Sequence, residues 1–145
     1  MTIRLRAHHL LCLLTYIGRG YTPAFTANYD AIAARLSQGE DIEIVAGPDD
    51  ICAPLLAEAT PHCLLPRIDE RDRLAARDVS LLLARPLQAG TRIDLDAALL
   101  RQMREAFATG LTRGACTGCE WQGLCSRIAR EGYAGTRVQA GVPLA

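Results

Sequence analysis

The sequence contains no lysine, because all sixteen of its basic residues are arginine. This absence excludes enzymes that use a P-loop lysine, a Schiff-base lysine or a lysine general base. Sixteen acidic residues balance the arginines, so the net charge gives no support to binding of a polyanion. We therefore expect no nucleic-acid partner.

The sequence also lacks a long hydrophobic run. The apolar stretch 10–14 is too short for a signal peptide, and no stretch approaches the about 20 apolar residues that cross a membrane. We therefore expect a cytoplasmic protein that does not contact a membrane. In a reducing cytoplasm, six cysteines favour metal or redox chemistry over a disulfide framework.

Length and periodicity predict a single domain, residues 1–145, with an α+β fold that is mostly helical. Alternating residues indicate short strands at 2–7 and 41–45, and the helical chain between them favours a parallel pair. Asp94 is expected to cap the fourth of about five helices. Helical spacing is found at 8–17, 24–36, 66–83, 95–108 and 120–130. The prediction is a two-stranded sheet, about five helices and a C-terminal cysteine-rich turn and helix.

Three cysteines in the segment 114–132 have the spacing of a metal site. Cys116, Cys119 and Cys125 form a Cys-x2-Cys-x5-Cys run, which a turn leading into a helix can bring to one point. Soft thiolates at short spacing select zinc, copper(I) or an iron–sulfur cluster over hard cations. The alternatives are buried cysteines that pack as small hydrophobic residues and a redox dithiol at Cys116 and Cys119.

Three thiols make an incomplete donor set, because structural zinc is four-coordinate and cubane clusters normally take four cysteines. Cys52 follows a turn after the second predicted strand, and it is the first candidate for the fourth ligand. Cys63 occupies a second loop position and is its main substitute. Asp49 and Asp50 precede Cys52, and we expect them to cap a helical turn or face water rather than bind metal.

The first predicted helix offers further donors. His8 and His9 precede Cys12 by four and three residues, so either pair would share a helix face. Cys12, the two histidines and His62 are therefore possible ligands or neighbours of ligands. The alternative is that Cys12 packs in a leucine-rich core while one histidine caps the helix.

Three separated motifs resemble one family. They are Arg-Ala-His-His-Leu-Leu-Cys at 6–12, Gly-Pro-Asp-Asp-Ile-Cys at 47–52, and Cys-Thr-Gly-Cys-Glu-Trp at 116–121. In this order they resemble domain-of-unknown-function family 1284, small bacterial and archaeal proteins proposed to bind an iron–sulfur cluster. The resemblance covers nearly the whole chain and implies a cluster but no reaction. Leu55 stands where some members carry a further cysteine.

These observations lead to three hypotheses. The first is a protein that holds one four-iron, four-sulfur cluster on Cys52, Cys116, Cys119 and Cys125, with a redox, sensing or structural role and an unknown partner. The second is a structural zinc module that uses the same thiols. The third is an enzyme in which Cys12 or a histidine of the first helix performs acid–base or nucleophilic chemistry.

Overall fold

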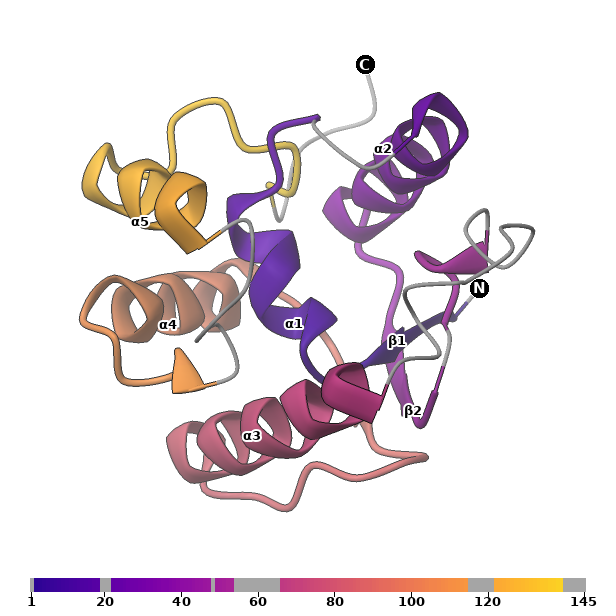
Figure 1. The fold of residues 1–145 in the computed structure, drawn as a ribbon, viewed down its shortest axis with the longest axis vertical. Helices are drawn as coiled ribbons and strands as arrows, with labels where there is room; N and C mark the ends of the chain where they lie inside the picture. Colours follow the sequence, from indigo (N-terminus) through magenta and orange to yellow (C-terminus); the bar gives the residue numbers. More distant parts are fainter. Residues whose placement is uncertain (1, 19–21, 48, 54–65, 115–121, 140–145) are drawn as a thin grey trace.

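A short helical segment lies at the centre of the molecule. It consists of α1 (His9–Cys12), which continues directly into a 3-10 turn, η1 (Leu13–Thr15). In Figure 1 the longer helices are arranged around α1, and the sheet lies at its N-terminal end. The structure is a computed structural model, and it describes residues 2–18, 22–47, 49–53, 66–114 and 122–139.

The sheet has three strands in the order β1-β2-β3, so the prediction of a two-stranded sheet is wrong. β1 (Ile3–Arg6) pairs in parallel with β2 (Ile42–Val45), as the sequence predicts. β3 (Arg92–Ile93) pairs antiparallel to β2. A strand of two residues is too short to show the alternation on which strand prediction depends, which explains the missed strand.

Four longer helices complete an α+β fold that is mostly helical, as expected. The capping residue of α4 differs from the prediction: Asp96, not Asp94, accepts a hydrogen bond from the backbone N–H of Leu99 at 2.8 Å. None of the helices in the described ranges is long and apolar enough to cross a membrane. The four helices are α2 (Pro23–Ser37), α3 (Pro66–Leu83), α4 (Ala97–Ala108) and α5 (Gln122–Arg130).

The central segment is shorter than the predicted helix over 8–17. The backbone becomes extended at Tyr16, and Gly18 has a φ of +94°, which a residue with a side chain rarely adopts. Because four leucines of this segment are buried, it is apolar on all sides and lies inside the core. These leucines are Leu10, Leu11, Leu13 and Leu14. The polar side chains of His9 and Thr15 are therefore held in the protein interior, whereas Cys12 is partly exposed.

Candidate metal centre

Asp49 joins the loop after β2 to the start of α1. Its Oδ2 atom lies 2.6 Å from Nδ1 of His9 and accepts a hydrogen bond from the backbone N–H of Arg6 at 2.7 Å. Its Oδ1 atom accepts from the backbone N–H groups of Ile51 and Cys52, both at 3.0 Å. Asp49 thus caps the following turn, as the sequence predicts, and it also holds His9.

Asp49 is ionised although its side chain is fully buried. Burial by itself raises the pKa of a carboxyl group, but the charge of His9 and the donated hydrogen bonds outweigh it and lower the pKa of Asp49 to about 2. An ionised carboxylate can only accept hydrogen bonds, so Nδ1 of His9 carries the shared hydrogen. In a neutral ring, Nε2 of His9 then keeps the lone pair that can bind a metal.

Cys52 brings a thiol to the same place. Cys52 is only 1% exposed, and the potential ligand atoms of His9, Asp49 and Cys52 all lie within 4.8 Å of one another. Burial disfavours the charge of the neighbouring Arg6, yet its interactions with Asp72 and Cys52 raise its pKa. A guanidinium beside a thiol favours the thiolate, which is the form that binds metals. These three residues form a candidate metal-binding group.

His8, which the sequence offers as a possible ligand or neighbour of ligands, is hydrogen-bonded to Asp72. Its Nδ1 lies 2.7 Å from Oδ1 of Asp72, while Oδ2 of Asp72 accepts from Nε of Arg6 at 2.7 Å. Burial and the charges of His9 and Arg6 lower the pKa of His8 to about 4, against the opposing effect of Asp72. The ring of His8 is therefore neutral at pH 7, and it packs 4.3 Å from the ring of His9.

A second sulfur-containing region lies at the far end of the central segment. Thr15 in η1 donates a hydrogen bond through Oγ1 to the Sγ atom of Cys125 in α5, at 3.1 Å. Cys12 ends α1 and lies outside the group formed by His9, Asp49 and Cys52. Both Cys12 and Cys125 are partly exposed thiols. Cys125, the last residue of the predicted trio, thus contacts the segment whose other end holds the candidate group.

The remaining predicted donors lie outside the described residues. They are the thiols of Cys63, Cys116 and Cys119 and the imidazole of His62. Their part in a metal site stays a prediction.

Comparison with known families identifies the chain more closely. A model of the family described as protein of unknown function, DUF1284, matches residues 20–125. The chain belongs to the DUF1284 family. The match includes all four predicted cysteine ligands, and it begins after α1. No curated protein and no solved structure matches this chain.

Asp49 is the residue of the DUF1284 chain whose role the sequence reveals only in part. Asp49 lies two residues before Ile51 and three residues before Cys52, and an aspartate at this spacing is recognisable as a cap. Its bond to His9 joins positions 40 residues apart, and no local pattern indicates such a contact. The candidate group therefore becomes visible only in the folded chain.

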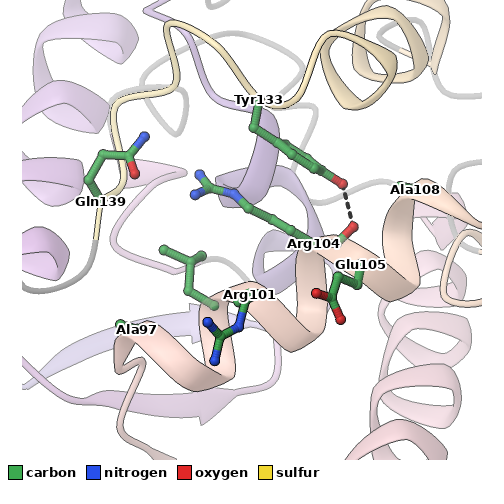
Figure 2. Close-up of a pocket in the computed structure, with 8 residues that line it drawn as sticks. Ala97, Arg101, Arg104, Glu105, Ala108, Tyr133 and Gln139 are labelled. Carbon is green, nitrogen blue, oxygen red and sulfur yellow. Dashed lines mark hydrogen bonds between the residues drawn. The ribbon is translucent and has the colours of Figure 1, made fainter.

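A cavity of about 420 Å³ on α4 is a separate feature of this DUF1284 protein. Figure 2 shows the Tyr133 hydroxyl donating to the carbonyl oxygen of Arg104, at 2.6 Å, beside this cavity. None of the residues that line it in the described part of the chain is a cysteine or histidine, so it is not part of the candidate metal centre. The lining comprises Ala97, Leu100, Arg101, Arg104, Glu105, Ala108, Tyr133 and Gln139.

Proposed function

We propose that this DUF1284 protein binds an iron–sulfur cluster through Cys52, Cys116, Cys119 and Cys125. The observation that carries the proposal is the approach of Cys52 and Cys125, from distant parts of the chain, to one short segment, His9–Thr15. Cubane clusters normally take four cysteine ligands, and the Cys-x2-Cys-x5-Cys run supplies the other two thiols.

The surroundings of the two described thiols suit metal-bound sulfur. The Thr15 hydroxyl donates to the sulfur of Cys125, and the Arg6 guanidinium interacts with Cys52. Hydrogen bonds and positive charge near sulfur stabilise thiolates and adjust the potential of a cluster. The apolar side chains of the central segment limit the access of water. When bound, the cluster supplies one-electron redox chemistry, which suits a redox or sensing role.

A single zinc ion is the second candidate, and the mixed donors of His9, Asp49 and Cys52 favour it. Zinc accepts imidazole, carboxylate and thiolate ligands together. However, both oxygens of Asp49 already accept two hydrogen bonds each. Asp49 therefore suits the orientation of His9 better than direct ligation. His9 and Cys52 alone leave two positions of a tetrahedral ion to be supplied by other residues.

Metal analysis of protein purified without oxygen tests the proposal. We expect a brown protein with visible absorption that contains iron and acid-labile sulfide in equal amounts. Colourless protein with stoichiometric zinc would overturn the cluster and support the second candidate.

Three serine variants test the ligand set. Cys52→Ser and Cys125→Ser should lose iron and sulfide, because each removes one of the four ligands. Cys63→Ser is the matched control, and it should keep both because Cys63 is outside the proposed set. Circular dichroism should verify that each variant is folded. Unchanged metal content in Cys125→Ser would show that the trio is not the centre, and loss in Cys63→Ser alone would move the fourth ligand from Cys52 to Cys63.

A further inference from the structure

Tyr29 of α2 is held rigidly against the end of the central segment. Its ring stacks on the ring of Tyr16, with centroids 3.7 Å apart and planes 5° apart. The edge of Phe25 closes another side, with centroids 5.8 Å apart. Tyr16 directly follows Thr15, which binds the sulfur of Cys125. The stacking therefore fixes the Tyr29 ring beside Tyr16, the residue that follows the far end of the segment.

The Tyr29 hydroxyl has no hydrogen-bond partner among the described residues, and it is buried from solvent. Tyr29 itself is 4% exposed. The neighbouring Tyr16 differs, because its hydroxyl binds Oδ1 of Asp30 at 2.7 Å and the carbonyl oxygen of Thr26 at 3.2 Å. Buried hydroxyls nearly always have a partner, so an orphaned one requires an explanation.

Two of the ionisable groups that act electrostatically on this hydroxyl are thiols, those of Cys12 and Cys125. Burial, followed by the charges of Cys12, Asp49, Tyr16 and Cys125, raises the pKa of Tyr29 well above its usual value. The hydroxyl thus stays protonated and has a hydrogen to donate. Asp49 is a poor acceptor for it, because each of its two oxygens already accepts two hydrogen bonds. The Tyr16 hydroxyl is already held by Asp30 and the carbonyl oxygen of Thr26. Of the four groups, the thiols of Cys12 and Cys125 remain as acceptors.

We propose that the Tyr29 hydroxyl donates a hydrogen bond to a sulfur atom of the bound metal centre, on the side where Cys12 and Cys125 lie. This inference rests on the proposed function, because the acceptor is sulfur held in place by the metal. It assigns Tyr29 to the centre, although the residue is neither a ligand nor recognisable from the cysteine motifs. Hydrogen bonds to sulfur increase metal affinity and raise the reduction potential of a cluster.

The variant Tyr29→Phe removes only the hydroxyl oxygen and keeps the aromatic stack. We expect it to bind metal about 10- to 100-fold more weakly, the usual effect of deleting a hydrogen-bond partner of a metal ligand. For a cluster, its reduction potential should also become more negative. The denaturation midpoint of the metal-free protein should stay the same or rise, because an unsatisfied buried donor has been removed.

Tyr16→Phe is the matched control, since it removes a hydroxyl from the other ring of the same stack. Its hydroxyl binds Asp30 and a backbone carbonyl, so its loss should lower the denaturation midpoint with and without metal. Metal affinity and potential should not change. The two variants therefore separate a role at the centre from a role in packing.

The outcomes distinguish this inference from the proposed function. Wild-type protein that retains no metal after anaerobic purification overturns both. If the wild type binds metal and Tyr29→Phe keeps the same affinity and potential, only the inference fails. A lower metal-free midpoint in Tyr29→Phe with unchanged affinity would mean that the hydroxyl binds protein atoms.

A spectroscopic measurement keeps the inference testable if Tyr29→Phe is poorly stable. The metal–sulfur stretching bands of the wild type should shift when the protein is refolded in D2O. Part of this shift should disappear in Tyr29→Phe, because one hydrogen bond to sulfur is missing. An identical isotope shift in both proteins would overturn the inference.

Discussion

The two ends of the central segment, His9–Thr15, differ in how fully their polar groups are satisfied. At the start, Asp49 accepts four hydrogen bonds and holds the ring of His9. At the far end, the Tyr29 hydroxyl has no partner within the described ranges. Both ends carry sulfur, Cys52 at the start and Cys125 at the far end.

The hydrogen bonds of Asp49 and His9 form when the chain folds, whereas the Tyr29 hydroxyl would gain its partner only when a metal binds. A fully bonded carboxylate and an oriented imidazole are fixed before any metal arrives, so they contribute to stability in the metal-free protein. A buried hydroxyl without a partner lowers the stability of the metal-free protein, and a hydrogen bond to metal-bound sulfur would reverse this loss. Substitution of Asp49 should therefore act mainly on folding, and substitution of the Tyr29 hydroxyl mainly on metal binding.

The largest expected effect on folding comes from Asp49→Asn. The amide NH2 would face the N–H of Arg6 and the Nδ1–H of His9, so two donors would lose their acceptor inside the core. Breaking a buried charged pair in this way costs roughly 3–5 kcal/mol. The free energy of unfolding of the metal-free protein, measured in urea, checks this value.

Asp50→Asn is the control for that variant. Asp50 is partly exposed and accepts hydrogen bonds from Arg4, so its loss should cost only about 1 kcal/mol. Equal losses in the two variants would contradict the special role of Asp49.

Acid should lower the free energy of unfolding through His8, and this loss should be slightly smaller than that caused by Asp49→Asn. His8 is neutral in the folded protein down to a pKa of about 4, whereas in the unfolded chain it takes up a proton near pH 6.5. Its contribution is therefore complete above pH 6.5 and is lost as the pH falls toward 4, by up to roughly 3 kcal/mol. Urea unfolding of metal-free protein at several pH values measures this loss.

His8→Gln provides the comparison, because glutamine does not titrate. Its stability should change much less between pH 6.5 and 4 than that of the wild type. Asp49 has a lowered pKa, so its contribution is lost in a separate and more acidic range. A flat wild-type profile between pH 6.5 and 4 would show that His8 is not held neutral.

The smallest expected effect is that of Thr15→Val at the far end. The variant keeps the shape of the side chain and removes the hydrogen bond to the sulfur of Cys125, at a cost of about 1 kcal/mol. A double-mutant cycle with Cys125→Ala should show that the two losses are not additive. Additive losses would mean that this contact does not join α5 to the central segment.

Part of the fold follows from local sequence patterns. Alternation over residues 2–7 and 41–45 and the helical crossover between them predict the parallel pair β1–β2. β3 has only two residues, so its pairing depends on the position of β2 and not on its own pattern. The first helix is overpredicted, because leucines continue past Cys12 while the backbone changes to a 3-10 turn.

The candidate site also shows that local sequence patterns do not predict contacts between distant elements. The spacing of His9 and Cys12 predicts a shared helix face, but the structure combines His9 with Asp49 and Cys52 instead. His8, four residues from the same cysteine, is hydrogen-bonded to Asp72 of α3. Spacing along one helix predicts which side chains are near neighbours, and it contains no information about the carboxylates of other elements.

The sequence by itself determined the kind of chemistry that this protein has available. The absence of lysine, the cysteine spacing and the three motifs indicate thiol-based metal binding and the DUF1284 family, because residue type and local spacing are properties of the chain alone. Only the tertiary structure decided which donors meet. Asp49 and Cys52 lie on the loop after β2 and Tyr29 lies on α2, and packing of the whole core brings both elements against the buried segment.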